Sequence, residues 1–211
     1  MTAATLGPAL APVILDGQWV RLEPLTLGHV ADLTRVALDD ELWKWTVDDV
    51  RTVSDLEDYV RRALDMERAG GALPFATVDR ASGRAIGSTR FALHEREHSR
   101  VEIGWTWVGR EWQRSAVNTE AKLLMLAHAF DVLGLRRVEL KTDVLNDRSR
   151  RAIARLGAVE EGILRQHVVT RSGRVRDTVY YSILSREWPA VRSGLRERLA
   201  RGPNPHTGAK R

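Results

Sequence analysis

The stretch Trp112-Gln113-Arg114-Ser115-Ala116-Val117-Asn118-Thr119-Glu120-Ala121-Lys122 is the most informative part of the sequence, because it joins a strand-like segment to an amphipathic helix. The segment before it, residues 101–108, has the alternation of a strand. A short loop that turns directly into a helix presents unpaired backbone N–H groups at the positive end of the helix dipole. Such a junction binds a phosphate or a pyrophosphate without a dedicated side chain. The loop is not rich in glycine, so neither a P-loop nor a dinucleotide-binding fingerprint fits it.

The composition is that of one soluble globular domain. The chain has 211 residues, of which 43% are hydrophobic and 29% are charged. It has no cysteine, which excludes disulfides, thiolate metal sites and cysteine nucleophiles, and no other cluster has metal-ligand spacing. No apolar run approaches the roughly 20 residues that span a bilayer, and the N-terminus lacks the basic region of a secretory signal. We therefore expect a cytoplasmic protein with no metal and no membrane contact.

The formal net charge of +5 raises the possibility of nucleic-acid binding. Much of the excess lies within residues 192–211, and elsewhere basic residues are interleaved with acidic ones, as in residues 61–68. Interleaving is typical of a solvated helix face. We rank a nucleic-acid-binding module last and expect no nucleic-acid partner, although the charge is compatible with the phosphates of a coenzyme.

Periodicity and turn residues predict a mixed α/β domain with one long sheet. The expected strands lie at about residues 19–24, 74–78, 85–93, 101–108, 137–142, 161–170 and 175–184. The expected helices lie at about residues 26–38, from a cap at Thr52 or Ser54 to Gly70, at 119–132, at 149–156, and after Pro189. The domain spans residues 18–188, between a flexible arm at 1–17 and a basic helix and tail at 189–211.

This order of elements resembles the GCN5-related N-acetyltransferase (GNAT) superfamily, and the chain is most similar to its RimJ/RimL-like branch. The resemblance covers roughly residues 18–188 and depends on the loop that starts at Gln113, on Asn146-x-x-Ser149 and on the shared order of strands and helices. It implies a single α/β domain whose central, mostly antiparallel, twisted sheet is flanked by helices and splayed at the cofactor site. The family loop usually reads Gln/Arg-x-x-Gly-x-Gly/Ala. Ala116 is a mild departure from this pattern, and Asn118 is a larger one that can instead cap the helix.

The family loop wraps the pyrophosphate of acetyl-coenzyme A (acetyl-CoA), which the resemblance therefore implies as the acyl donor. By resemblance, the coenzyme contacts the strand before the loop, the loop itself and the Asn-x-x-Ser helix. The residues concerned are Trp105, Thr106, Trp107, Val108, Gln113, Arg114, Ser115, Ala116, Val117, Asn118, Thr119, Asn146 and Ser149. Residue chemistry alone makes Asn146 and Ser149 helix-capping residues. The family pattern instead sets Asn146 against pantetheine and Ser149 near the sulfur, where it assists the leaving thiolate.

Glu102 is the candidate general base. In simple alternation it lies on the side of its strand opposite Val101 and Trp105. A carboxylate whose pKa is raised by partial burial suits this task, and the position resembles that of the strand glutamate proposed as base in related enzymes. The alternative is an edge-strand solubility residue or the partner of an arginine. His94 and His98 are other candidate bases, although a lone surface histidine is more often inert.

The acidic segment at residues 39–49 is expected to recognise the acceptor. The resemblance places it over the acceptor side of the cleft, and its carboxylates surround two tryptophans in an otherwise basic protein. Carboxylates attract an ammonium ion, and an indole face can hold it by a cation–π contact. We select Trp43, Trp45 and Asp48 as substrate-binding residues. The alternative is that the acids flank helix N-termini while the tryptophans, Trp43 above all, pack in the core.

The leading hypothesis is an acetyl-CoA-dependent N-acetyltransferase. It would transfer an acetyl group to a primary amine, either a protein N-terminus or a small molecule, by direct attack in a ternary complex. The alternative from another class is a catalytically silent acyl-CoA-binding sensor, which the altered loop leaves open. The expected partners are acetyl-CoA and the amine acceptor, and a homodimer is one of the oligomeric states that the sequence leaves open.

Overall fold

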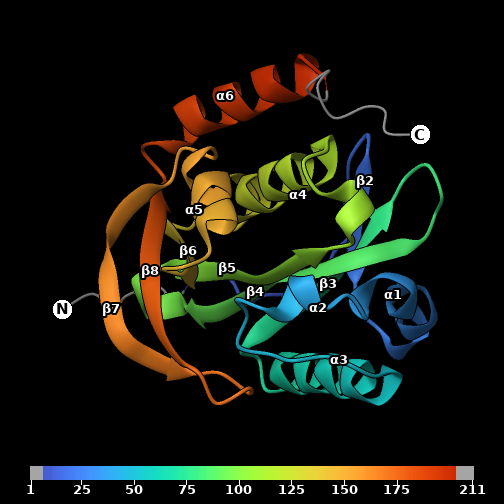
Figure 1. The fold of residues 1–211 in the computed structure, drawn as a ribbon. Coiled ribbons are helices and arrows are strands. Elements are labelled where there is room, and N and C mark those ends of the chain that lie inside the picture. The colour runs from blue at the N-terminus through green and yellow to red at the C-terminus, as the bar shows by residue number, and fades with distance from the viewer. Residues whose placement is uncertain (1–6, 203–211) are drawn as a thin grey trace.

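The computed structural model describes residues 7–202, which fold around one sheet of eight strands (Figure 1). The strands are β1 (Leu15–Asp16), β2 (Val20–Pro24), β3 (Ala72–Asp79), β4 (Ala85–Glu95), β5 (Arg100–Val108), β6 (Arg137–Asp143), β7 (Val159–Val169) and β8 (Val175–Leu184). Their order in the sheet is β1-β2-β3-β4-β5-β6-β8-β7. Every neighbouring pair is antiparallel except β5 and β6, which are parallel. The expected fold, a mixed α/β domain with a mostly antiparallel sheet, is confirmed.

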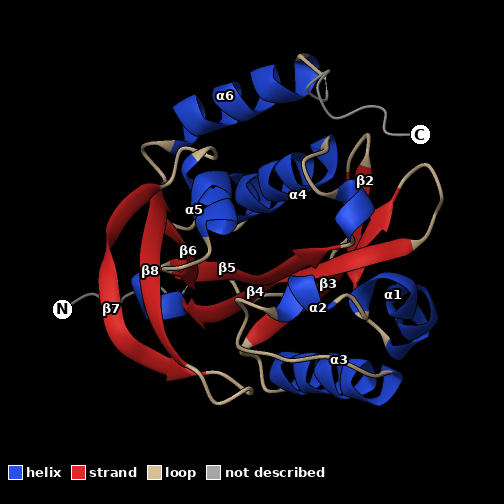
Figure 2. Ribbon diagram, viewed as in Figure 1, coloured by secondary structure: helices blue, strands red, loops and turns tan. Residues whose placement is uncertain are grey.

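Helices cover both faces of the sheet (Figure 2). They are α1 (Val30–Ala37), α2 (Asp40–Trp43), α3 (Val53–Arg68), α4 (Ala116–Ala127), α5 (Asp147–Ala154) and α6 (Trp188–Ala200), with short helical turns η1 (Leu27–His29), η2 (Arg96–His98), η3 (Arg110–Trp112) and η4 (His128–Val132). In the view of Figure 2, α4, α5 and α6 lie above the sheet and α1, α2 and α3 lie below it. A separate hydrophobic cluster fills the space between the sheet and each helical layer.

Local capping explains where the helices begin. Thr52, one of the two caps that the sequence predicted for α3, is its N-cap and forms a capping box with Asp55. At α4 the prediction was wrong by three residues, because the helix begins at Ala116 and not at Thr119. The reason is that Ser115 is the N-cap, with its hydroxyl accepting a hydrogen bond from Val117 N at 3.3 Å. Asn118 therefore lies in the first turn of the helix and does not cap it.

The structure adds β1 and α2, which the sequence did not predict. β1 pairs with β2, and the turn between them is held by the buried Glu120 carboxylate, which accepts hydrogen bonds from the N–H groups of Gln18, Trp19 and Val20. Within the stretch expected to be a flexible arm, Leu10 packs against the core. Residues 1–6 of that arm and residues 203–211 of the tail lie outside the described residues. Between residues 7 and 202, no helix combines the length and the apolar character that a membrane span requires.

The sheet opens between its two parallel strands. β5 and β6 pair only from Arg100 to Glu102 and from Arg137 to Glu139. Beyond these pairs β5 continues to Val108 and β6 to Asp143, but the two strands are no longer paired with each other. Backbone groups of β5 that would otherwise be paired are thereby left for another partner.

A bulge on the opposite edge of β5 accompanies this opening. Ser88 of β4 faces Trp107, but Arg90 faces Gly104, so Trp105 and the following residue both lie opposite Thr89. Trp105 has a φ of +48°, a conformation that is unusual for a side chain of this size. The extra residue also changes which face of the sheet the later side chains of β5 point to. Trp105 and Trp107 pack on the cluster of α1 to α3, so the predicted placement of Trp105 on the same side as Val101 was wrong.

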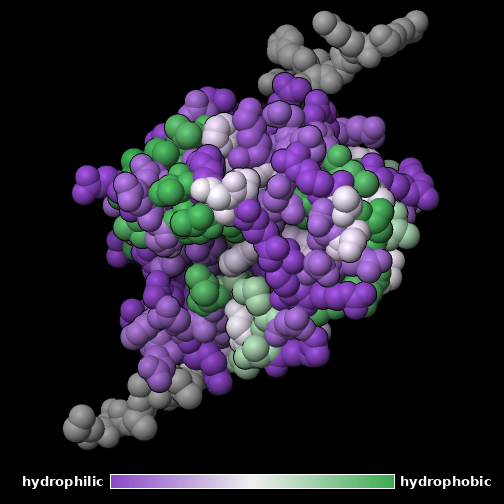
Figure 3. Space-filling view, turned by 60° about the horizontal axis from the view of Figure 1, so that its bottom comes forward, coloured by the Kyte–Doolittle hydropathy of each residue, from purple (hydrophilic) through white to green (hydrophobic). Residues whose placement is uncertain are grey.

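Figure 3 shows that the surface on this side of the molecule is mostly hydrophilic, with smaller hydrophobic areas between the polar ones. Several of the exposed hydrophobic side chains belong to β7 and β8, among them Val159, Ile163 and Val175.

Candidate active site

The N-terminus of α4 has free hydrogen-bond donors. Within residues 7–202, no acceptor forms a hydrogen bond with the backbone N–H of Arg114, Ser115, Ala116 or Asn118. These groups lie at the positive end of the helix dipole, and the exposed Arg114 adds a full positive charge. Arg114 has a φ of +63°, which turns the chain sharply into the helix. The geometry is that of an anion-binding site.

Side-chain contacts tie this loop to its surroundings. Gln113 donates from Nε2 to the carbonyl of Val108 at 3.1 Å, and its Oε1 accepts from Arg148 of α5 at 2.7 Å. Arg110 binds Asp39 through two hydrogen bonds of 2.8 Å. The loop is therefore fixed to β5, to α5 and to the segment before α2. Sequence reasoning did not select Arg148 or the Asp39–Arg110 pair, because neither belongs to a local pattern.

The N-terminus of α5 is capped by Asn146. Its Oδ1 accepts a hydrogen bond from Ser149 N at 3.0 Å, so the predicted capping role is confirmed. Ser149 is half-buried, and its hydroxyl forms no hydrogen bond with any of residues 7–202. That hydroxyl is consequently available to another partner. The roles that the resemblance gives to both residues toward the coenzyme stay predictions.

The bulged end of β5 packs on an aromatic cluster. Tyr59 donates from its hydroxyl to the carbonyl of Trp105 at 3.4 Å and accepts from Trp107 Nε1 at 3.2 Å. The Trp107 ring lies 5.3 Å from the ring of Trp43, so both side chains are core residues and Trp107 can serve the site through its backbone only. The Arg90 guanidinium, which is buried, stacks 4.8 Å from the Trp105 ring.

Glu102 lies at the last paired position before the sheet opens. Its side chain is 2% exposed. Lys141 Nζ is 2.7 Å from Glu102 Oε2, an ion-pair distance with a direction that is poor for a hydrogen bond. Burial raises the pKa of Glu102, and the neighbouring Lys141 opposes this shift. A Cβ atom at Gly104 would come within 2.5 Å of Glu102 Oε1, so the glycine leaves the space that this carboxyl occupies.

The two histidines proposed as other bases lie at the far end of β5. His94 is the next-to-last residue of β4, and His98 belongs to η2, which lies in the turn between β4 and β5. Burial, with a smaller contribution from Arg96, lowers the pKa of His94. His98 is exposed and lies 3.8 Å from Glu95. Since the bulge is at the opposite end of the strand, Glu102 has the more suitable position.

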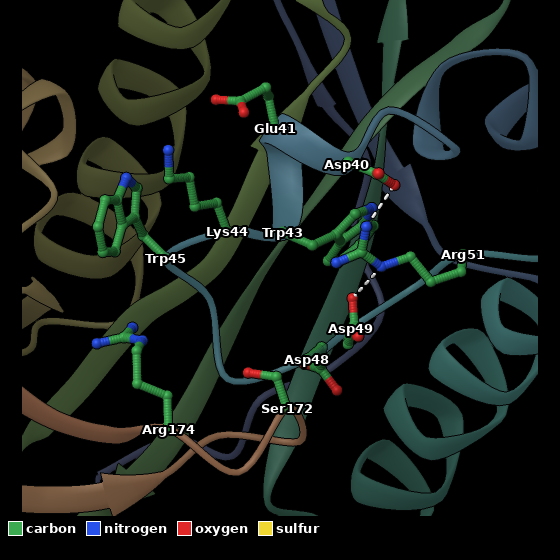
Figure 4. Close-up of a pocket in the computed structure, with 10 residues that line it drawn as sticks. All are labelled: Asp40, Glu41, Trp43, Lys44, Trp45, Asp48, Asp49, Arg51, Ser172 and Arg174. Atoms are coloured by element: carbon green, nitrogen blue, oxygen red, sulfur yellow. Dashed lines mark hydrogen bonds and ion pairs between the residues drawn. The ribbon is translucent and has the colours of Figure 1, made fainter.

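The acidic segment lines a cavity of about 400 Å³ between the α2–α3 connection and the β7–β8 turn (Figure 4). Its lining residues are Asp40, Glu41, Trp43, Lys44, Trp45, Asp48, Asp49, Arg51, Ser172 and Arg174. The structure thus brings together all three residues selected as substrate-binding. Trp43 is only 3% exposed, however, and donates from Nε1 to the carbonyl of Ala37 at 2.6 Å. For Trp43 the structure favours the alternative of a core residue.

Most carboxylates of this segment are held by arginines. Arg51 lies 2.5 Å from Asp40 and 2.6 Å from Asp49, as the dashed lines in Figure 4 show. Arg62 lies 3.1 Å from Asp48. These ion pairs reduce the negative potential that the sequence suggested.

The indole of Trp45 also has charged neighbours of its own. Lys44 Nζ lies 5.4 Å and Arg174 Cζ lies 5.3 Å from its ring centroid. Both are within the range of a cation–π contact. A ligand cation would therefore have to displace one of these side chains from the indole face.

Comparisons with known proteins agree with this geometry. A family model described as an acetyltransferase (GNAT) domain matches residues 20–159. The chain is 35% identical over 174 residues to YdaF of Bacillus subtilis strain 168, a proposed ribosomal N-acetyltransferase, with 79% of this chain and 90% of the relative covered. The structure is similar to that of a GCN5-related N-acetyltransferase from Brucella melitensis, with a TM-score of 0.85, 33% identity and coverage of 98% and 92%. It is also similar to RimJ of Mycobacterium smegmatis in complex with CoA-disulfide, with a TM-score of 0.72, 25% identity and coverage of 87% and 90%.

Proposed function

The chain belongs to the GNAT acetyltransferase family, and from this premise we propose that it transfers the acetyl group of acetyl-CoA to the α-amino group of a protein N-terminus. The observation that carries the proposal is the opening between β5 and β6 after Glu102, together with the unpaired N–H groups that begin α4. The similarity to RimJ with CoA-disulfide supports the coenzyme, and the similarity to the proposed ribosomal N-acetyltransferase YdaF supports the acceptor class.

The residues at the start of α4 fit a pyrophosphate. The free N–H groups of Arg114, Ser115, Ala116 and Asn118 would donate to its oxygens. Arg114 and Arg148 would add positive charge. Ala116 is the first helical residue, and its methyl group leaves room for a phosphate to approach the backbone. The free backbone edge of residues 105–108 would hold pantetheine and the acyl end. When bound, acetyl-CoA supplies the acetyl group as an activated thioester.

Three side chains would then act on protons and orientation. Glu102 accepts the proton of the acceptor ammonium, directly or through water, and its raised pKa makes it a stronger base than an ordinary glutamate. Asn146 orients pantetheine while it caps α5. The free hydroxyl of Ser149 donates to the departing sulfur. Direct attack in a ternary complex needs no covalent enzyme intermediate, which agrees with a chain that has no cysteine.

The acceptor would enter through the cavity beside Trp45 and Asp48. A volume of about 400 Å³ is enough for the first residues of a peptide. Its lining carries both signs of charge, with Glu41 and Asp48 among the acidic residues and Lys44 and Arg174 among the basic ones (Figure 4). Mixed charges suit a peptide N-terminus, which presents an ammonium group next to backbone carbonyls and varied side chains.

The test is an acetyl-transfer assay with matched amines. Short peptides with a free N-terminus, the same peptides with a blocked N-terminus and an internal lysine, and a polyamine are each incubated with acetyl-CoA. Thiol release and the product mass are followed. We expect turnover with the free N-terminal peptides alone, and fragmentation that places the acetyl group on the α-amine. Turnover with the polyamine alone would overturn the acceptor class, whereas coenzyme binding without turnover on any amine would favour the sensor.

A further inference from the structure

A buried lysine lies directly behind the β5 bulge. Lys122 of α4 is only 4% exposed. Its Nζ donates to Thr106 Oγ1 at 2.6 Å and to Thr89 Oγ1 at 3.1 Å, and these two hydroxyl oxygens are 2.8 Å apart. Thr106 is one of the two bulge residues, and Thr89 is the residue of β4 that faces them. A single ammonium group therefore joins both strands where their register shifts.

The bulge needs such support because its backbone is strained. Trp105 has a positive φ, and a non-glycine residue keeps this conformation only where its surroundings hold it there. On the α3 side, the Tyr59 hydroxyl binds the carbonyl of Trp105. On the α4 side, Lys122 binds the next residue, Thr106. The two contacts fix the bulge from opposite faces of the sheet.

The surroundings of Lys122 indicate that burying its ammonium group lowers the stability of the fold. The groups that face its ammonium from β4 and β5 are the neutral hydroxyls of Thr89 and Thr106, and from α4 the sulfur of Met125 lies close to Thr89. The nearby carboxylate of Glu120 binds the β1–β2 turn instead. Burial lowers the pKa of Lys122 to about 7. A methionine of similar length would avoid this cost of burying a charge.

We propose that Lys122 is a positioning residue for acetyl transfer, which holds Thr106 and with it the backbone of residues 105–108 in the bulged form that receives the acyl end of the coenzyme. The inference rests on the proposed function and adds to it a residue that touches neither substrate. A cation retained at a position where it weakens the fold is expected where a site, and not the core, requires it.

The first test separates positioning from packing. In Lys122→Met we expect kcat to fall at least tenfold, because the acyl end is held less well, while the KM for acetyl-CoA changes less than about threefold because the loop before α4 is intact. The melting temperature should not fall, since Thr89 and Thr106 still bind each other. A loss of activity that follows a lowered melting temperature would overturn the proposal, because Lys122 would then be a structural residue.

Threonine variants test the route through Thr106. Thr106→Val should lose activity as Lys122→Met does, Thr106→Ser should recover most of that loss, and the double variant should be no worse than either single one, because both changes break the same contact. Thr34→Val is the matched control, since it removes a hydroxyl that binds only Val30 within α1. Additive losses in the double variant would overturn the coupling.

NMR of the lysine side chains gives a measurement that does not depend on catalytic activity. The sequence has only four lysines to assign, which are Lys44, Lys122, Lys141 and Lys210. With ¹³C-labelled lysine, the NMR signal that is missing in Lys122→Met should titrate near neutral pH and shift when coenzyme A is added. Amide exchange of residues 105–108 should be faster in Lys122→Met. A signal that ignores coenzyme A, together with wild-type kcat and unchanged exchange in Lys122→Met, would overturn the proposal. Wild-type protein that acetylates no amine would instead overturn the proposed function, and the coenzyme A titration would still decide the role of Lys122.

Discussion

At the start of α4 several backbone N–H groups have no hydrogen-bond partner within residues 7–202, whereas around the cavity beside α2 nearly every carboxylate is held by an arginine. The first region, residues 105–119 with the start of α5, is here called the coenzyme side. The second, residues 39–51 with the β7–β8 turn, is called the acceptor side. The coenzyme side lies against two buried basic side chains, Arg90 and Lys122, that form no ion pair within residues 7–202. Its charge is uncompensated, as an anionic ligand requires, while the acceptor side is close to balanced.

This difference indicates what each side recognises. Unpaired N–H groups at a helix N-terminus cost folding free energy, and that cost would be recovered if an anion bound there. Paired carboxylates cost little and keep the segment in place. The coenzyme side thus has its hydrogen-bond donors in place before a ligand binds. The acceptor side has a cavity lined by charges of both signs and does not have a strong electrostatic potential of one sign. Five changes or measurements test this contrast.

The largest effect is expected where the two sides meet, at Glu102. Glu102→Gln should lower kcat by roughly 100-fold or more, because the base is lost. Burial raises the pKa of Glu102, so wild-type kcat should fall on the acid side of that pKa, where the carboxyl is protonated, and level off above it. The variant should lose this acid limb in a pH–rate profile. Glu139→Gln, at the facing position of β6, should keep kcat and an acid limb, which should move to lower pH because the charge of Glu139 raises the pKa of Glu102. An acid limb retained in Glu102→Gln would assign the base elsewhere.

The next effect is on the free energy of unfolding, which replacement of a basic residue should raise beside the coenzyme side but not on the acceptor side. The pKa of Lys122 is lowered from 10.5 to about 7, so below that range the folded protein bears the full cost of a buried charge, and the cost is relieved as pH rises toward 10.5. Lys122→Met should therefore raise the free energy of unfolding by roughly 1–4 kcal/mol in acid, with a gain that shrinks as pH rises. Arg51→Met, which breaks exposed ion pairs of the acceptor side, should give no gain at any pH. Urea denaturation across pH measures both, and an equal response would contradict the contrast.

A bulky residue at Ala116 should weaken coenzyme binding. Ala116→Leu places a side chain over the N–H groups that begin α4, and we expect at least a tenfold loss of affinity for coenzyme A, or roughly 1.4 kcal/mol. Calorimetry measures this directly. Ala200→Leu, at the exposed end of α6, is the matched control and should bind as the wild type does. Unchanged affinity in Ala116→Leu would move the pyrophosphate away from this loop.

The smallest effect is expected on the acceptor side. Trp45→Ala and Asp48→Asn should each raise the KM for the acceptor by roughly two- to fivefold, since a contact of about 0.5–1 kcal/mol is lost among groups that are already paired. The KM for acetyl-CoA should not change. Steady-state kinetics with the best peptide measures both constants. An acceptor KM that stays at its wild-type value in both variants would remove the cavity from the site.

The same contrast explains what the sequence could predict. The coenzyme side is local in sequence, since a strand, a loop, a cap and a helix follow one another, so its fold and its donors were predictable. The start of α4 was misplaced only because Ser115 and Asn118 are both good caps. The bulge at Trp105 was not predictable, because it depends on the register of β4.

On the acceptor side the acids are local but their partners are not. Arg62 comes from α3, Arg110 from η3 and Arg171 from the β7–β8 turn. No pattern in residues 39–49 indicates that the fold places these arginines beside the acidic side chains. Lys122 was missed for a related reason: on a helix its charge suggests a solvated face, and only the packing of α4 on the sheet buries it.

We propose above that backbone groups of the loop before α4 and of the β5 bulge form hydrogen bonds with the coenzyme. Amide hydrogen exchange of the wild-type protein, with and without coenzyme A, tests it most directly. We predict that coenzyme A slows exchange at residues 105–108 and 114–118 and leaves residues 39–51 unchanged. Protection confined to residues 39–51, or no protection at either backbone segment under saturating coenzyme A, would contradict the account.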